Sequence, residues 1–219
     1  MKILFKSIAL VVIIFSLGIN LYSQEQEKME TLFGSGKTSV GGYGGPEVKF
    51  AKLNSKLNND WGVLLGLRGG VILNSALSFG GAGYLLFTDH KIKNSGYTAD
   101  DVYLRFGYGG VFLEYINSSN SVVHFTLNSL IGAGGAAYTG PVWCEDCHRK
   151  WIYEGSGFFV FEPGATIDVN LLKNIRLSFG ASYRIIAGLD LRDYNNNLLN
   201  DSKDLQGLSA NIMLKFGDF

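Results

Sequence analysis

The chain has 219 residues and carries 19 Lys and Arg against 19 Asp and Glu, so its formal net charge is zero. This balance excludes the strongly basic surface by which proteins bind nucleic acids and other polyphosphates. The 29 glycines, three prolines and 13% aromatic residues favour an all-β protein with glycines at its bends over a helical protein.

The first 23 residues have the layout of a secretory signal peptide. Two lysines precede an apolar run over residues 8–17, and polar and small residues follow. The run is too short for a membrane-spanning helix, and no second long apolar run follows it. We expect cleavage after Ser23, an N-terminal periplasmic lead over residues 24–37 and one β-domain over residues 38–219.

Eight stretches beyond residue 37 alternate in polarity with a period of two and show no helical period. They cover residues 38–50, 61–74, 76–88, 102–117, 121–138, 156–171, 174–187 and 206–217. In the seventh stretch, Ile175, Leu177 and Phe179 share one face, and Arg176 and Ser178 share the other. We therefore predict eight strands, each with an apolar and a polar face.

Short and long connections alternate between these strands. Asn74-Ser75 and residues 117–120 and 172–174 are tight, whereas the other four connections are long and polar. This asymmetry is typical of outer-membrane barrels, and a soluble β-sandwich has no need of it. We predict an all-β fold, an eight-stranded antiparallel up-and-down transmembrane β-barrel with short periplasmic turns and longer extracellular loops. The even strand number places both termini in the periplasm.

The same alternation predicts which polar side chains enter the barrel lumen. The predicted lumen residues are Glu47, Lys49, Arg68, Arg105, Glu114, His124, Glu162, Asp168, Arg176, Arg184 and Lys215. Because an unpaired charge in a narrow barrel is costly, we expect these side chains to pair into a plug rather than line a wide pore. Arg105 and Glu114 have opposite parity, so we expect a β-bulge at Gly109-Gly110 between them.

The motif Cys144-Glu-Asp-Cys147-His148 lies in the third long connection. It fits a covalent haem site, a thiol redox pair and half of a zinc site. We favour a disulfide between Cys144 and Cys147, since these are the only cysteines of an exported chain. Haem is the second hypothesis, with His148 as near and His90 as far axial ligand. Three ligands are too few for a closed zinc site, and a redox pair lacks its βαβ context. We expect no metal and no cofactor.

A second candidate site pairs His124 with Thr126 on one strand face. The pair is similar to the His-and-hydroxyl pairs of outer-membrane lipid hydrolases. A nucleophile requires a base and an orienting acid together, and no acid lies near this pair in the sequence. We expect His124 to be a structural lumen residue and predict no catalytic residue.

The chain resembles uncharacterised outer-membrane β-barrel proteins of Bacteroidota in GGYGGPEVKF, GLRGGVILNSALSFGGAGY, FGYGGVFLEYI, FEPGATIDVNLLKNIRLSFGASYR and the terminal LKFGDF. The resemblance covers nearly the whole mature chain, and the architecture is more distantly similar to OmpA-like and OmpX-like eight-stranded barrels. It implies a fold and an outer-membrane location, and it transfers no catalytic residue. Phe219 is out of parity with Phe216, so two phenylalanines compete as the residue that the assembly machinery recognises.

We therefore predict a non-enzymatic outer-membrane barrel that presents four surface loops for a structural, adhesive or interaction role. Its expected partners are outer-membrane lipid, the barrel-assembly machinery and an extracellular ligand that the sequence does not identify. Nucleic acid is not among them. The alternatives are an enzyme that modifies lipid or lipopolysaccharide and a narrow channel for small solutes. The nearly balanced lumen charges argue against a large conductance.

Overall fold

The computed structural model describes residues 39–53, 61–92, 102–140 and 152–219. The predicted signal peptide and periplasmic lead, and the Cys144 to His148 motif, lie outside these residues. Within the described ranges, no helix has both the length and the apolar character needed to cross a membrane.

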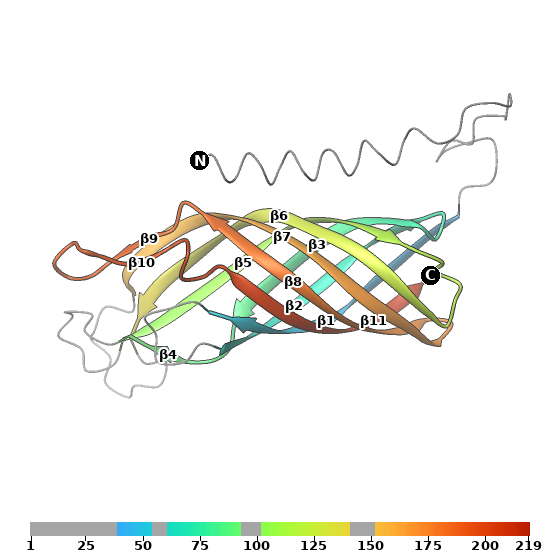
Figure 1. Ribbon diagram of the computed structural model, residues 1–219, viewed down its shortest axis with the longest axis horizontal. Helices are drawn as coiled ribbons and strands as arrows, with labels where there is room; N and C mark the ends of the chain where they lie inside the picture. Colours follow the sequence, from blue (N-terminus) through green and yellow to red (C-terminus); the bar gives the residue numbers. More distant parts are fainter. Residues whose placement is uncertain (1–38, 54–60, 93–101, 141–151) are drawn as a thin grey trace, which may run out of the picture. The chain divides into compact units, whose positions relative to one another are not determined.

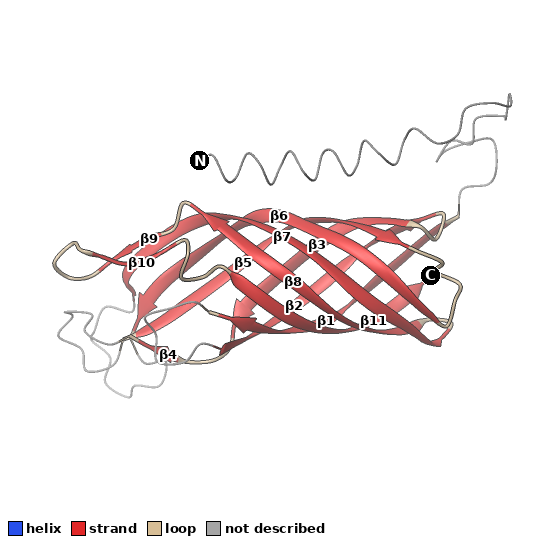
Figure 2. Ribbon diagram, viewed as in Figure 1, coloured by secondary structure: helices blue, strands red, loops and turns tan. Residues whose placement is uncertain are grey.

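Eight long strands build the domain (Figures 1 and 2). They are β1 (Val40–Lys52), β2 (Trp61–Leu73), β3 (Leu77–Leu86), β5 (Tyr103–Ile116), β6 (Val123–Thr139), β7 (Ile152–Leu172), β8 (Ile175–Ala187) and β11 (Gly207–Asp218). Three short strands, β4 (His90–Lys91), β9 (Asp190–Arg192) and β10 (Leu198–Asp201), lie within the long connections. The largest difference from the predicted ranges is in β7, which starts at Ile152 because its ladder with β6 continues to Thr139.

The strands close into a barrel. Each long strand pairs antiparallel with its sequence neighbours, and the pairing of β1 with β11 joins the two ends of the series. Closure leaves no long strand with an unpaired edge along its whole length. The predicted fold class, an eight-stranded antiparallel up-and-down barrel, is confirmed.

The barrel has a turn end and a loop end. Residues 74–76, 117–122 and 173–174 form the short connections of the turn end, where β1 begins and β11 ends (Figure 1). Asn74 and Ser75 both have left-handed backbone, with φ of 51° and 53°, and the Ala76 amide donates to the Leu73 carbonyl oxygen, as in a type I′ turn. The strand ends that flank the four long connections lie at the opposite, loop end.

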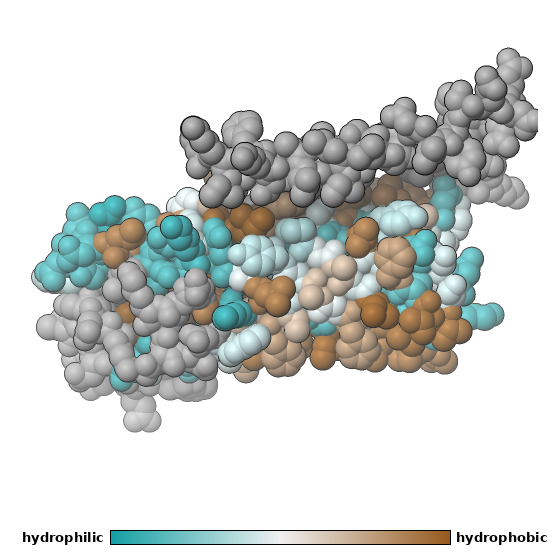
Figure 3. Space-filling view, viewed as in Figure 1, coloured by the Kyte–Doolittle hydropathy of each residue, from teal (hydrophilic) through white to brown (hydrophobic). Residues whose placement is uncertain are grey.

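The outer wall of the barrel is apolar. Leu67, Val111 and Phe159 are 70%, 69% and 73% exposed. Among the outward positions of the eight described strands, the only charged residues are Arg105 and the strand-end residues Lys52 and Asp218. Figure 3 shows apolar residues over the barrel wall and hydrophilic residues gathered at the loop end.

The predicted inward placement of Arg105 is wrong, and so is the predicted bulge. β5 pairs with β3 and β6 without a register shift, so Arg105 faces outward and forms an ion pair with Asp89. Gly109 and Gly110 instead allow neighbouring strands to approach closely, because a Cβ on Gly110 would lie 2.2 Å from the Ile131 carbonyl oxygen. Unbroken alternation therefore keeps Glu114 inside and leaves Arg105 outside.

Candidate functional site

The candidate site is the barrel lumen. Ten of the eleven predicted lumen side chains point inward, and each of these residues is at most 5% exposed. They are Glu47, Lys49, Arg68, Glu114, His124, Glu162, Asp168, Arg176, Arg184 and Lys215. Residues buried to this extent do not line an open aqueous channel.

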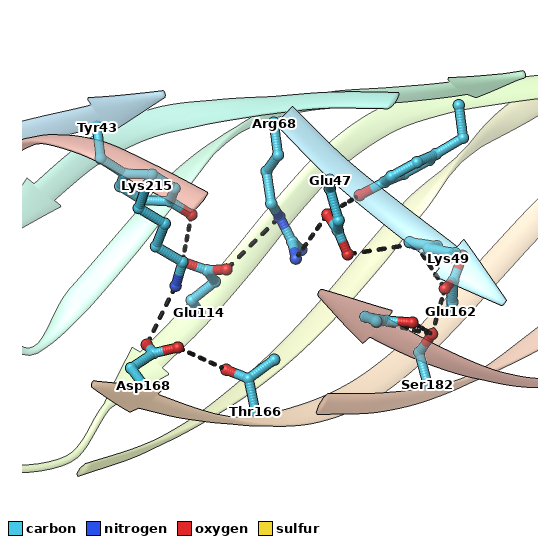
Figure 4. A network of polar contacts seen from close by, with 12 residues as sticks. Tyr43, Glu47, Lys49, Arg68, Glu114, Glu162, Thr166, Asp168, Ser182 and Lys215 are labelled. Carbon is cyan, nitrogen blue, oxygen red and sulfur yellow. Dashed lines mark hydrogen bonds and ion pairs between the residues drawn. The ribbon is translucent and has the colours of Figure 1, made fainter. Parts of the chain in front are cut away.

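Five of these residues form a chain of ion pairs across the middle of the lumen, here called the central network (Figure 4). The Arg68 guanidinium lies between two carboxylates, 3.5 Å from Glu114 and 3.8 Å from Glu47. Lys49 Nζ donates to Glu162 Oε1 at 2.7 Å and lies 4.0 Å from Glu47. Charges from β1, β2, β5 and β7 therefore compensate one another where water is excluded.

Each carboxylate of the central network also accepts a hydrogen bond from a tyrosine. Tyr43 donates to Glu114 at 2.5 Å. Tyr84 donates to Glu47 and Tyr108 donates to Glu162, each at 2.6 Å. The phenols satisfy carboxylate lone pairs without adding charge, which lowers the cost of burying the acids. The sequence prediction missed these donors, although strand parity places all three tyrosines on the inner faces.

Asp168 is the centre of a second group, the turn-end cluster. Its carboxylate accepts hydrogen bonds from Thr126 at 2.8 Å, Thr166 at 3.2 Å and Lys215 at 3.1 Å. His124 Nε2 lies 3.7 Å from the same carboxylate. The β6–β7 register places Asp168 directly opposite His124.

This geometry bears on the lipid-hydrolase hypothesis. The acid that the sequence neighbourhood of His124 lacks is supplied by strand pairing. However, the Thr126 hydroxyl donates to Asp168, and His124 Nε2 has no hydrogen-bond partner among the described residues. A nucleophilic hydroxyl must instead donate to its general base. The three side chains therefore meet without forming a nucleophile and base pair.

Phe219 closes the lumen at the turn end. The Arg176 guanidinium carbon lies 3.8 Å from the centre of the Phe219 ring, and the Tyr43 ring stacks on it at 6.3 Å. Arg176 also donates to the Ser119 hydroxyl at 2.8 Å. Phe216 faces outward and is 46% exposed. Phe216 thus lies on the outer face of β11, whereas Phe219, one residue beyond that strand, turns inward.

At the loop end the interior changes from polar to apolar, forming what is here called the loop-end core. Leu53, Leu64, Leu104, Leu191 and Leu205 are all fully buried there. Leu191 and Leu205 come from the connection between β8 and β11, so this connection supplies part of the buried interior at the loop end.

Arg184 lies at the boundary between the two interiors. Its Nε donates to the Leu205 carbonyl oxygen at 2.8 Å, and its guanidinium lies 5.2 Å from the Phe106 ring centre. Near this boundary Tyr138 donates to Asn200 at 2.5 Å. Both hydrogen bonds tie the connection between β8 and β11 to the strands below it.

The barrel interior therefore holds an ion-paired plug towards the turn end and an apolar core at the loop end. Within the described part of the chain, no group of three or more His, Cys, Asp or Glu side chains could hold a metal ion. The haem, zinc and disulfide hypotheses for Cys144, Cys147 and His148 concern residues outside the described ranges.

Comparison with protein-family models and with curated protein sequences finds no match. Solved structures do share the fold. Neisserial surface protein A (NspA) superposes with a TM-score of 0.50 at 14% sequence identity, covering 82% of this chain and 97% of NspA. Ail, the attachment invasion locus protein of Yersinia pestis, gives 0.47 at 12% identity over 81% of this chain and 97% of Ail. Ail in complex with the heparin analogue sucrose octasulfate gives 0.49 at the same identity and coverage. At these identities the likeness to NspA establishes the closed eight-stranded fold.

Proposed function

We propose that the protein is a non-enzymatic integral outer-membrane barrel that presents four long loops at the cell surface for a structural, adhesive or interaction role. One observation carries this proposal: a closed barrel has an apolar outer wall around a charged interior. In water this arrangement would expose the apolar side and bury the charged side, each at a cost. In a bilayer the outer wall meets hydrocarbon, and closure leaves no long strand of the wall with an unpaired edge along its whole length.

The same proposal assigns an orientation. Outer-membrane barrels keep their short turns in the periplasm and their long loops outside. The turn end, with both ends of the barrel domain, would then face the periplasm. The apolar, outward Phe216 is the residue of the last strand that we assign to recognition by the barrel-assembly machinery. The motif resemblance to barrels of Bacteroidota supports the same location.

The non-enzymatic part of the proposal rests on the closed lumen and on the hydrogen bond from Thr126 to Asp168. An enzyme acting on lipid would need an accessible nucleophile paired with its base. A channel would need an open path, whereas the central network and Phe219 fill the lumen. Neither alternative has a specific observation in its favour.

Two exposed lysines at opposite ends of the barrel test location and orientation together. Lys203 lies in the connection between β8 and β11, and Lys173 lies in the turn between β7 and β8. In intact cells a membrane-impermeant amine reagent should modify Lys203 and spare Lys173, and lysed cells should show both modified. The unboiled protein should also migrate as a compact, heat-modifiable band. Recovery in the soluble periplasmic fraction, or equal labelling of both lysines in intact cells, would contradict the proposal.

A further inference from the structure

The ladder between β1 and β11, here called the closing seam, is interrupted in its middle. It is regular from Glu47 to Ala51 of β1, and it skips Gly45 and Pro46. Pro46 also pairs with Leu67 of β2. Because proline has no backbone N–H, this second pairing is of the non-hydrogen-bonded kind, so the Pro46 nitrogen faces β11. The missing hydrogen bond therefore falls on the closing seam.

A short segment of the closing seam remains on the turn-end side of this interruption. Its three pairs are Gly42 with Asp218, Tyr43 with Gly217 and Gly44 with Phe216. Three of these six residues are glycines, and glycine weakens a strand because it has no side chain to pack and loses the most backbone entropy. Strand ends with few contacts open locally, so this segment needs further contacts to stay paired.

Phe219, the residue that follows β11, supplies such contacts. Its ring stacks on Tyr43 of β1, with the ring centres 6.3 Å apart. The guanidinium carbon of Arg176, on β8, lies 3.8 Å from the centre of the same ring, where a cation is attracted to the aromatic face. The ring therefore contacts a side chain on each of the two strands that flank β11.

The position of Arg176 is fixed from a different part of the barrel. Its Nη2 donates to the carbonyl oxygen and to the hydroxyl of Ser119, at 3.3 and 2.8 Å. Ser119 belongs to the turn between β5 and β6, and both residues are buried, at 4% exposure each. Phe219 thus packs against a guanidinium that a second turn holds in place.

We propose that Phe219 is a latch on the closing seam: its ring, held by Tyr43 and Arg176, keeps the turn-end segment paired and slows the opening of the closed barrel. The latch forms after closure, because Tyr43 and Phe219 meet only when β1 pairs with β11. This inference goes beyond the proposed function, since it needs only the closed barrel. It also separates the two phenylalanines, because Phe216 lies on the outer face of β11.

Native-state hydrogen exchange of the detergent-solubilised protein tests whether the latch acts on the seam. The Gly217 amide, which donates to the Asn174 carbonyl oxygen, reports on the end of β11. In Phe219→Ala its exchange should accelerate about tenfold, equivalent to about 1.4 kcal/mol. The Ile116 amide, which donates to the Ala76 carbonyl oxygen at another turn-end hairpin, is the control and should keep its rate.

Unfolding and refolding rates in urea test when the latch forms. Because it forms after closure, Phe219→Ala should raise the unfolding rate about tenfold and leave the refolding rate unchanged. Arg176→Met should raise the unfolding rate less in the Phe219→Ala background than in the wild type, since the contact is already lost. The matched cycle with Phe216→Ala should be additive, because that ring lies on the opposite face.

Three results would overturn the inference: equal acceleration of exchange at Gly217 and Ile116, refolding slowed as much as unfolding is accelerated, or additivity of Arg176→Met with Phe219→Ala. An unchanged Gly217 exchange rate in Phe219→Ala would overturn it as well. If Phe219→Ala does not refold, Phe219→Leu keeps most of the apolar volume and gives the same comparisons, with a smaller acceleration expected at Gly217 and none at Ile116.

Discussion

The polar interior of the barrel and its loop-end core are built on the same strands, but the first buries charged side chains and the second buries apolar ones. Towards the turn end, four carboxylates face Lys49, Arg68, Arg176 and Lys215, and towards the loop end the same lumen holds fully buried leucines. In the proposed membrane, burying apolar side chains inside the barrel would stabilise the fold little relative to exposing them to lipid, because both surroundings are apolar. Charges there make the two faces of most of the long strands unequal, so a one-residue slip that exchanged them would be costly. At the loop end, where water surrounds the barrel, burying leucine side chains away from water stabilises the fold.

The largest expected effect comes from breaking one pair of the central network. Glu162→Gln leaves Lys49 buried without its nearest carboxylate, which should destabilise the barrel by about 3–5 kcal/mol. Urea-dependent refolding into phospholipid vesicles measures this free energy. Lys49→Met combined with Glu162→Gln removes both charges while keeping an acceptor for Tyr108 and Ser182, so it should cost less than the single change. A double variant that is less stable than Glu162→Gln would show that the pair is not the source of the effect.

A change in the loop-end core should have a smaller and more local effect. Leu191→Ala creates a cavity in the loop-end core and should destabilise the connection between β8 and β11 by about 2 kcal/mol, at the low end for buried leucine because a connection at the barrel end can relax into the cavity. Limited proteolysis should cut the connection faster, whereas the heat-modifiable band should remain. Leu198→Ala, at a half-exposed position of β10, is the control and should change little. Loss of the whole barrel in Leu191→Ala would mean that the two interiors unfold as one unit.

The loop-end core should also respond to pH through His90, which is 2% exposed. Burial lowers the pKa of His90, nearby Arg105 lowers it further and Asp89 opposes the shift. Because the folded pKa is below the unfolded value of about 6.5, the stability that neutral His90 contributes is present above that pH and is lost as the pH falls below it. Hydrogen exchange at the Ile92 amide, which donates to the Val102 carbonyl, should therefore accelerate in acid beyond its intrinsic pH dependence. His90→Gln should abolish this excess, and an unchanged pH profile in that variant would assign the effect to another group.

The smallest effect concerns the connection between β6 and β7. The disulfide between Cys144 and Cys147 remains a prediction, and intact mass of the mature protein with and without reductant should differ by two hydrogens. A loop this short restricts few unfolded conformations, so Cys144→Ser should change stability only at the low end of the ~0–5 kcal/mol range. A mass increased by haem would instead favour covalent attachment through the C-x-x-C-H motif.

The number of strands and the face on which each side chain lies could be predicted from the sequence because a period of two is a local property of each strand, and the alternation of short and long connections predicted the barrel. Ile175, Leu177 and Phe179 alternate with Arg176 and Ser178 whatever the strand pairs with, so ten of the eleven proposed lumen residues were placed on the inner face by parity alone. The error at Arg105 has a specific cause. The sequence shows that two charges on β5 differ in parity, but a bulge is decided by the neighbouring strands, and both ladders of β5 are regular.

What the sequence by itself determined is thus the barrel, from its alternating short and long connections, and the face on which each side chain lies, from the alternation within single strands. The tertiary structure decided which lumen residues meet. The Tyr43 contact with Glu114 joins residues 71 positions apart, and the Asp168 position opposite His124 depends on the β6–β7 register. It also decided that Phe219 turns inward against Arg176 and that leucines from the connection between β8 and β11 are buried at the loop end. These contacts depend on how the sheet closes and how far its strands are staggered, and no local pattern encodes that geometry.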